Sequence, residues 1–425
     1  MTTTRNGNRQ NDKKSVPLGT DSVLAVEPSN PDSEKFPDSD RAEAIKIRYA
    51  LQETAQYLLR HEPEGRRILR CGVQIAANAL QSDNPAIPHG CVTVARDTHS
   101  GRASYSNLMH CESPWVCPVC SAWKTEQDKK EVNNACVAAA AKGMIVIMVT
   151  YTQSHIVSDV LSSLLQINKQ ARRWFKSNTS KEGYSWQDLK TEYGLVGGII
   201  NLECTHGKNS WHPHNHELIF IDPEKSTSQD ISELRWKMAR RWQMAVEKFG
   251  GSADMIHGFD LRYGDAAVSD YIAKIGCEPV GKWSIEAELT KSGQKKGRGK
   301  GRTAFQLLYD YRFQKDKQAG ALFIEFAREF AGSAHIRWSQ GLRELLELDT
   351  FIRPAKDETE NHQAELPPDY QPYLAIPLET WKRVVLLRTG RRAQLLLACE
   401  SGEVAICELF ASWQYDGSLY WYSDT

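Results

Sequence analysis

The chain lacks the features of a secreted or membrane-spanning protein. It has no long apolar run and no apolar stretch near its N-terminus, and its ten cysteines are scattered, with one CxxC among them. A membrane-spanning helix needs about 20 apolar residues, and small secreted domains depend on paired cysteines, so both classes are disfavoured. The 425 residues, 41% hydrophobic and 25% charged, instead predict a cytoplasmic protein of two or three domains without internal repeats.

Excess charge is also absent, because 53 Lys and Arg residues balance 53 Asp and Glu residues. Zero net charge does not favour nucleic-acid binding, but the distribution of charge matters more than its total. Residues 291–302 hold six cations, no acid and four glycines, the composition of a flexible loop that can follow a DNA backbone. The predicted phosphate-binding residues are Lys295, Lys296, Arg298, Lys300 and Arg302. A solvated loop without a ligand is the alternative.

Residues 211–221 (WHPHNHELIFI) form the most informative segment, with His212, His214 and His216 in strict alternation before an apolar run. Successive side chains of a strand point to opposite faces, so the three imidazoles share one face. Such a strand can present a metal ion. Histidines that are merely solvated on a polar strand are the alternative.

The segment before it, residues 194–206, is also strand-like, and residues 207–210 have the length of a hairpin loop. If those four residues are the whole loop, position 206 pairs with 211, and Glu203 stands opposite His214. Two imidazoles and a carboxylate suit Mn²⁺ or Mg²⁺, which can polarise a phosphate. His212 and His216 are about 13 Å apart along a strand, too far to share one ion. The two histidine ligands are therefore His214 and either His212 or His216.

The HPHNH sequence and its apolar strand resemble the histidine-hydrophobic-histidine (HUH) motif of rolling-circle replication initiators, the Rep proteins of small bacterial plasmids. These proteins nick DNA at a replication origin, and the resemblance selects His214 and His216 as the metal ligands. The middle position, usually hydrophobic, is Asn215 here, which leaves the packing of that face open. Matching stretches at residues 302–308, 322–327 and 338–342 extend the resemblance over about residues 66–345.

The family also uses a nucleophilic tyrosine in a helical Tyr-x-x-Lys pattern, which Tyr271 and Lys274 supply within residues 265–276. The pKa of a tyrosine is ordinarily about 10, so a cation such as Lys274, or a metal-held phosphate, is needed for attack at neutral pH. A structural ion pair between Asp270 and Lys274 is the alternative. The acidic residue often found four positions before the tyrosine is Ala267, which leaves the terminating step open.

A second metal site is predicted from Cys111, Cys117 and Cys120, whose spacing suits structural zinc. The residues available as fourth ligand are Cys71, Cys91, His99 and His110. Residues 70–72 resemble the family's first cysteine, which favours Cys71. A redox CxxC, or buried thiols without metal, are the alternatives. The five remaining cysteines have no such spacing and are expected in the core: Cys136, Cys204, Cys277, Cys399 and Cys407.

The predicted fold class is α+β. Expected strands at 144–152, 195–205, 211–221 and 259–263, with helices at 157–177 and 228–248, follow the ferredoxin-like split β-α-β-β-α-β order. An antiparallel sheet then has the histidine strand near its middle, helices on one face, and the other face open to DNA. The expected domains are a disordered tail (1–40), a helical and Cys-rich zinc module (41–143), an HUH endonuclease domain with the basic loop (144–345), a linker (354–370) and a small, strand-rich accessory domain (371–425).

These features together predict a metal-dependent plasmid replication initiator of the bacterial cytoplasm that nicks and rejoins single-stranded DNA through a 5′-phosphotyrosyl intermediate. Its expected partners are origin DNA, duplex and single-stranded, and the host helicase and polymerase, with no membrane. The alternatives are an HUH-type transposase or relaxase, or a zinc-dependent DNA-binding regulator without catalysis.

Overall fold

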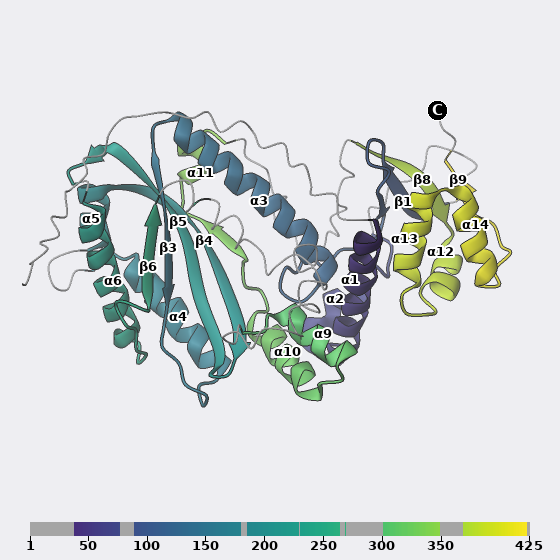
Figure 1. Ribbon diagram of the computed structural model, residues 1–425, viewed down its shortest axis with the longest axis horizontal. Helices are drawn as coiled ribbons and strands as arrows, with labels where there is room; N and C mark the ends of the chain where they lie inside the picture. The colour runs from purple at the N-terminus through teal and green to yellow at the C-terminus, as the bar shows by residue number, and fades with distance from the viewer. Residues whose placement is uncertain are drawn as a thin grey trace, which may run out of the picture.

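The computed structural model describes residues 38–76, 89–179, 185–228, 230–263, 268, 301–348 and 369–422. It contains a five-stranded and a four-stranded antiparallel sheet, which lie at opposite ends of the molecule with helices around and between them (Figure 1). The predicted α+β class with antiparallel sheets is therefore confirmed. No helix in the described ranges is both long and apolar enough to cross a membrane.

The large sheet has the strand order β6-β3-β5-β4-β7. Its strands are β3 (Ile145–Thr152), β4 (Gly194–Gly207), β5 (Ser210–Ser226), β6 (Phe259–Tyr263) and β7 (Ile336–Trp338). Helices α4 (Leu161–Phe175) and α5 (Trp186–Tyr193) connect β3 to β4, and α6 (Ile231–Lys248) connects β5 to β6. The elements follow one another in the predicted order, apart from the additional α5, and the histidine strand β5 lies in the centre of the sheet.

One face of this sheet packs on α4, α5 and α6. Tyr151 and Ile219 from the strands meet Trp242 of α6 in this core, and all three are at most 1% exposed. Odd-numbered residues of β5 such as Ile219 point this way, so the histidines at even positions point to the opposite face.

Helix α3 (Pro118–Ala141) covers part of that opposite face. Its Val132 and Ala139 pack with Leu218 and Phe220 of β5, and α11 (Leu342–Leu345) contributes Leu342 to the same cluster. The expectation that the whole face is open was wrong, because the even positions of β5 change from histidine to Leu218 and Phe220. These apolar side chains need cover, whereas His212, His214 and His216 are not part of the cluster with α3.

Between the two sheets lies a helical region with its own core. It is built from α1 (Asp38–Leu58), the 3₁₀ turn Pro63–Gly65, α2 (Arg66–Arg70), α9 (Ala304–Phe313) and α10 (Lys317–Glu329). Leu51 of α1, Leu307 of α9 and Phe323 of α10 are fully buried there together with the cysteines of the predicted zinc site. The cysteine region therefore folds against helices that follow the predicted basic loop in sequence.

The small sheet joins segments from both ends of the described chain, in the order β2-β1-β8-β9. Its strands are β1 (Val92–Asp97), β2 (Ala103–Ser106), β8 (Tyr370–Ile376) and β9 (Tyr420–Trp421). The segments 41–143 and 371–425, which the sequence assigns to separate units, thus share a sheet. The remaining elements are α12 (Leu378–Thr380), the π-helical turn Trp381–Val385, α13 (Arg391–Ser401) and α14 (Glu403–Ser412).

The prediction that the C-terminal unit is rich in strands was wrong. The segments 393–398 and 403–407 belong to helices α13 and α14, and only two strands, β8 and β9, are found among residues 369–422. Leu395, Leu396 and Cys399 are buried on one side of α13, a spacing of one, three and four that fits a helix face. Short apolar runs do not distinguish a buried helix from a buried strand.

Candidate metal centres

The β4–β5 hairpin sets the geometry of the first centre. Gly207 pairs with Ser210, so the turn holds only residues 208 and 209, and the pairing continues through His206 with Trp211 to Glu203 with His214. The predicted register is therefore confirmed. Because directly opposed residues share a face, Glu203 of β4 lies beside the histidines of β5.

Glu203, His214 and His216 form one compact group. The Nε2 atoms of His214 and His216 are each 3.0 Å from the same carboxylate oxygen, Oε2 of Glu203. His216 is 2% exposed, whereas Glu203 and His214 are half-buried. The nitrogen and oxygen atoms of the group all lie within 4.8 Å of one another, close enough for a single ion. The structure thus brings together the three residues that the sequence selects.

The second nitrogen of each ring is held by another group. His214 Nδ1 lies 3.2 Å from the carbonyl oxygen of His212, which can only accept a hydrogen bond, so this nitrogen carries the proton. His216 Nδ1 lies 2.9 Å from the hydroxyl of Thr150 on β3. In a neutral His214 the Nε2 lone pair then faces the lone pairs of the Glu203 carboxylate, and a cation between them removes the repulsion. Metal-binding histidines have this arrangement of a second hydrogen bond.

The charges of this group are coupled. In the absence of an ion, burial raises the pKa of the Glu203 carboxyl, but the hydrogen bonds and positive charge of His214 and His216 in their protonated form outweigh it, so the net pKa lies well below its usual value. Glu203 is therefore ionised at neutral pH. An anionic oxygen and two imidazole nitrogens make a donor set that suits a divalent ion such as Mn²⁺ or Mg²⁺.

His212 occupies a different position on the same strand. Its Nε2 lies 3.0 Å from the hydroxyl of Thr152, and it is not part of the Glu203 group. Burial lowers its pKa to about 4, with further lowering from the charges of His214 and His155, so the ring is neutral at physiological pH. Its separation from the ion-binding group agrees with the sequence argument from distance.

Asn215, at the position that is usually hydrophobic, faces the helices and is fully buried. Its Nδ2 lies 3.4 Å from the carbonyl oxygen of Tyr151 on β3, a long hydrogen bond. The side chain therefore packs within the α4–α6 face and does not disturb the histidine face.

The second centre consists of four buried cysteines. Their sulfurs are 3.5 Å (Cys71 to Cys120), 3.7 Å (Cys111 to Cys120) and 3.8 Å (Cys71 to Cys117) apart. Four sulfurs about 2.3 Å from one tetrahedral zinc ion lie about 3.8 Å from each other, so these separations fit the ion. Cys71 completes the set, and among the other candidates only His110 comes near, with Nδ1 3.8 Å from Cys120 Sγ.

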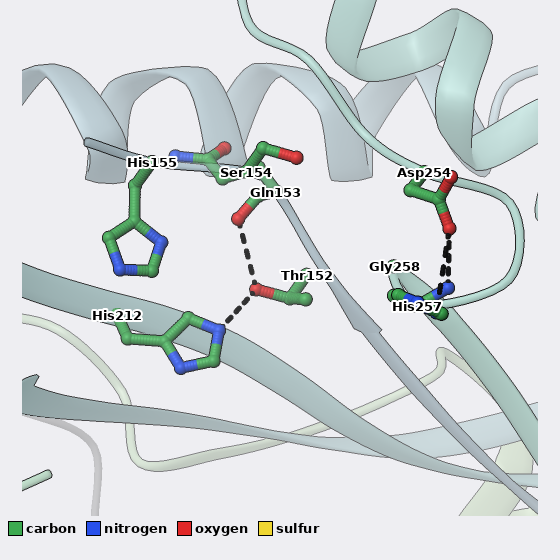
Figure 2. Close-up of a pocket in the computed structure, with 8 residues that line it drawn as sticks. All are labelled: Thr152, Gln153, Ser154, His155, His212, Asp254, His257 and Gly258. Carbon is green, nitrogen blue, oxygen red and sulfur yellow. Dashed lines mark hydrogen bonds and ion pairs between the residues drawn. The ribbon is translucent and has the colours of Figure 1, made fainter. Parts of the chain in front are cut away.

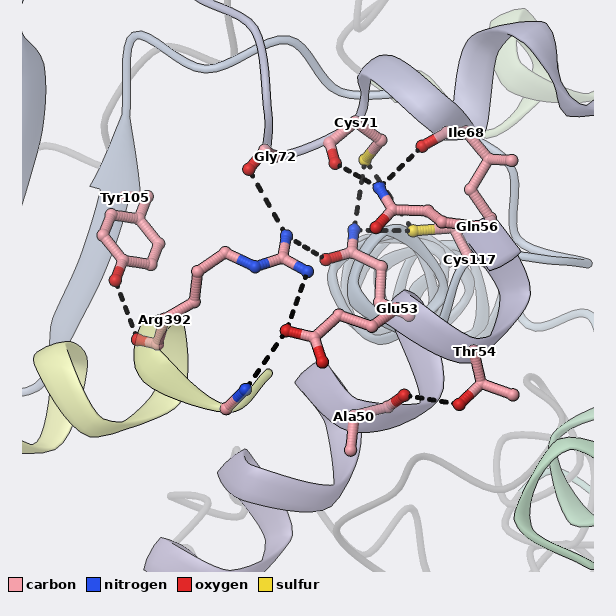
Figure 3. Close-up of polar contacts among 12 residues, drawn as sticks. Ala50, Glu53, Thr54, Gln56, Ile68, Cys71, Gly72, Tyr105, Cys117 and Arg392 are labelled. Carbon is pink, nitrogen blue, oxygen red and sulfur yellow. Dashed lines mark hydrogen bonds and ion pairs between the residues drawn. The ribbon is translucent and has the colours of Figure 1, made fainter. Parts of the chain in front are cut away.

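The cysteine group is linked to the C-terminal helices by buried hydrogen bonds. Gln52 of α1 donates through Nε2 to Cys117 Sγ at 3.3 Å and to Cys71 Sγ at 3.4 Å. Its Oε1 accepts from Nη1 of Arg392 on α13 at 2.8 Å. Arg392 also donates to the carbonyl oxygen of Gly72 (Figure 3). Gln52 and Arg392 are at most 2% exposed. Neither residue could be identified from the sequence, since both lie outside any motif.

The other cysteines were predicted to be core residues. Cys204 and Cys399 are buried and Cys136 is half-buried, but Cys407 is exposed, so the prediction was wrong for Cys407. It lies on the outer side of α14, while Ile406 beside it faces the core. Cys277 lies outside the described residues.

Several predicted residues also lie outside the described ranges: Tyr271, Lys274, Lys295, Lys296, Arg298 and Lys300. Arg302 is described, and its backbone pairs with that of His206 at the end of β4. Its Nη1 lies 3.1 Å from Asp310 and 3.0 Å from Asp316. The guanidinium of Arg302 is therefore paired with two carboxylates. This favours a structural role, in which Arg302 anchors the end of the predicted basic loop, over a contact with a DNA phosphate.

Comparisons with known proteins bear on the identity of the chain. It is 25% identical over 328 residues to a protein named Protein rep from Streptomyces lividans, covering 64% of this chain and 70% of that protein. It is also 27% identical over 154 residues to a neomycin resistance protein from Streptomyces cyanogenus, covering 32% of this chain and 35% of the relative. No family model and no solved structure matches. The first relative carries the name of the family to which the motifs pointed, and the resemblance of this chain to the Rep proteins is thereby confirmed.

Proposed function

We propose that the protein is a plasmid replication initiator of the HUH endonuclease type, which nicks and rejoins one DNA strand at a replication origin. The observation that carries this proposal is the convergence of Glu203, His214 and His216 on one point of the central strand pair. The similarity to a protein named Protein rep supports it, as does the order of β6, β3, β5 and β4, which is the order expected of a split βαβ sheet.

In the proposed reaction, the phenolic oxygen of Tyr271 attacks the scissile phosphorus in line. A bond from phosphorus to this oxygen forms while the bond from phosphorus to the 3′ oxygen breaks. The phenol loses its proton and the departing oxygen gains one, which leaves a 5′-phosphotyrosyl link and a free 3′-hydroxyl. Because one phosphodiester replaces another, the reverse reaction rejoins the strand. The free 3′-hydroxyl would prime a host polymerase, with a host helicase opening the duplex.

The residues of the first centre have separate tasks in this reaction. A divalent ion, Mn²⁺ or Mg²⁺, bound by Glu203, His214 and His216 would polarise the scissile phosphate. Thr150 and the carbonyl of His212 hold the two imidazole rings in position through their Nδ1 atoms. Lys274, one helical turn from Tyr271 in the predicted helix, would lower the pKa of the phenol by its positive charge.

The four cysteines are proposed to hold structural zinc. All four are at most 4% exposed, and zinc sites without an open position are structural. A zinc ion with four thiolates carries net negative charge, which is costly to bury. Gln52 and the guanidinium of Arg392 lie where they offset it, and the backbone N–H of Cys120 points to Cys117 Sγ at 3.5 Å. The hydrogen-bond donors and the positive charge around the sulfurs are therefore suited to a buried zinc ion with four thiolate ligands.

Covalent labelling tests the proposed nickase. A single-stranded origin oligonucleotide labelled on the 3′ side of the nick should become attached to the protein in Mn²⁺, and Tyr271→Phe should remove the adduct, because the ring remains while the nucleophilic oxygen is gone. Lys274→Ala should only slow its formation. Peptide mapping identifies the attached residue. An adduct on another tyrosine would move the nucleophile, and nicking without any adduct would refute the mechanism.

The basic loop should control affinity and its dependence on salt. Replacing Lys295, Lys296, Arg298 and Lys300 with Gln should reduce the slope of log affinity against log salt by up to about 0.9 for each lost contact with duplex DNA. The cleavage position should stay the same, since phosphate contacts do not read bases. Arg302→Gln is the matched control, expected to lower the melting temperature with little change in slope. An unchanged slope in the fourfold variant would show that the loop does not bind DNA.

A further inference from the structure

A pocket of about 230 Å³ adjoins the Glu203–His214–His216 group. It is lined by Thr152, Gln153, Ser154, His155, His212, Asp254, His257 and Gly258 (Figure 2). One wall is the loop that follows β3, the opposite wall is the loop between α6 and β6, and His212 of β5 closes the side toward the ion-binding group. No motif pointed to His155, Asp254 or His257, which are isolated in the sequence.

Aromatic rings connect the pocket with the ion-binding group. The ring centroid of His212 lies 5.0 Å from that of His214, and His155 stacks on His212 at 4.8 Å with an interplanar angle of 23°. The hydrogen bond to Thr152 fixes the His212 ring in this position. Figure 2 shows the two parallel imidazoles on one side, with Asp254 and His257 across from them. A flat ring placed in the pocket can therefore stack against imidazole.

The pocket does not have the donor arrangement of a second metal centre. Oδ1 of Asp254 accepts the backbone N–H groups of Ile256 at 2.8 Å and His257 at 2.6 Å, so this carboxylate is used within its own turn. Within the described ranges, the groups whose donor atoms converge on one point are the cysteine group and the Glu203 group. The pocket therefore offers rings and hydrogen-bonding groups, rather than a set of metal ligands, to an occupant.

Exposed apolar side chains flank the pocket on both loops. Ile156 and Val157 follow His155 and are 64% and 69% exposed, and Ile256, next to His257, is 71% exposed. Large aliphatic side chains at this exposure mark a contact surface when they are grouped. Apolar and aromatic side chains beside hydrogen-bonding groups are how proteins hold unstacked nucleobases.

We propose that this pocket receives the base of one nucleotide next to the scissile phosphate, with the base stacked on His155. The inference rests on the proposed function, because the position of the phosphate is taken from the Glu203–His214–His216 group. The pocket would fix the register of the single strand, so that one particular phosphodiester meets the ion-binding group. His155 is in this view a positioning residue for the DNA and takes no part in the bond changes.

Binding of abasic oligonucleotides tests the inference. Fluorescence anisotropy with a single-stranded origin oligonucleotide, in a Tyr271→Phe background, measures affinity without cleavage. Each position flanking the nick is made abasic in turn, and the scan is repeated with His155→Ala. In the parent, one position should weaken binding roughly tenfold or more. His155→Ala should show a similar loss with the intact strand and no further loss at that position, because the same contact is removed twice.

His99→Ala, at an exposed histidine of the loop between β1 and β2, is the matched control and should reproduce the parent scan. A thermal melt shows whether His155→Ala remains folded; if it does not, His155→Gln, which keeps a polar side chain but has no ring, replaces it and should give the same selective insensitivity. The inference would be overturned if abasic substitution weakened binding equally at every position in parent and variant. It would also be overturned if neither an abasic position nor the substitution of His155 changed the affinity. Because anisotropy does not depend on nicking, the result can be read even where the covalent-labelling experiment fails.

Discussion

His216→Ala should abolish DNA cleavage while origin binding is retained. Its Nε2 is one of two imidazole nitrogens beside Glu203, and a metal ion at a phosphate contributes several kcal/mol to the transition state. Since about 1.4 kcal/mol corresponds to a tenfold change in rate, we expect a loss of at least about a hundredfold. Nicking of supercoiled plasmid in Mn²⁺, with and without EDTA, measures the effect. Glu203→Gln should also impair cleavage, because the amide loses the negative charge.

His212→Ala is the matched control for this experiment, since it removes the same side chain from the same face of the same strand. Its ring is bonded to Thr152 and lies outside the ion-binding group, so cleavage should fall much less. Because His216 is buried, melting temperatures must show that the variant is folded. Cleavage that persists in EDTA or in the His214→Ala, His216→Ala double variant would refute the metal centre. A larger loss from His212→Ala than from His216→Ala would mean that the ligand pair is wrong.

Cys117→Ser should cost the protein both its zinc and its folded central region. Cys117 is fully buried, and its sulfur accepts the backbone N–H of Cys120 and the side chain of Gln52. Apparent binding free energies of structural zinc are about 10–16 kcal/mol, comparable to the whole stability of a typical domain. Metal analysis should find about one zinc per chain before the substitution and none after it, together with aggregation or loss of cooperative unfolding.

Cys407→Ser and Cys399→Ser are the controls. The first replaces an exposed thiol and should change neither zinc content nor stability. The second replaces a buried thiol of the small-sheet core and should lower stability modestly without releasing zinc. Parent protein that is free of zinc yet fully stable would assign the four cysteines to the core instead.

Local patterns explain what could be predicted from the sequence. Alternation along β5 and the short loop at 207–210 are enough to place Glu203 opposite His214, because pairing in a hairpin propagates from the turn. The spacing of Cys111, Cys117 and Cys120 indicated three zinc ligands, but Cys71 needed the resemblance to be chosen. It lies 46 residues from Cys117 in the sequence, and spacing rules do not reach that far.

Contacts between distant segments were not predictable. The pairing of β1 with β8 joins two short strands, and neither strand's own sequence indicates which strand it pairs with. Gln52 and Arg392 have no motif, and the pocket at His155 forms only because β3 and β6 are neighbours, with Thr152 N bonded to Gly258 O at 3.0 Å. The pairing of Arg302 with Asp310 and Asp316 was missed for a different reason, since these residues are near in sequence but a count of charges does not show which cations are paired with carboxylates.

The small sheet also determines when the protein can finish folding. A ribosome releases β1 and the cysteine ligands early, but Arg392 follows Gln52 by 340 residues, and β8 is made only shortly before it. At roughly 5–20 residues per second, synthesis takes on the order of half a minute to supply the missing partners. During that interval one edge of β1 has no neighbouring strand and the cysteine region lacks its cationic support. A nascent chain in this state is exposed to pairing with other strands. Synthesis of β8 and α13 is therefore the step that completes the small sheet and the hydrogen bonds of Arg392 to the cysteine region.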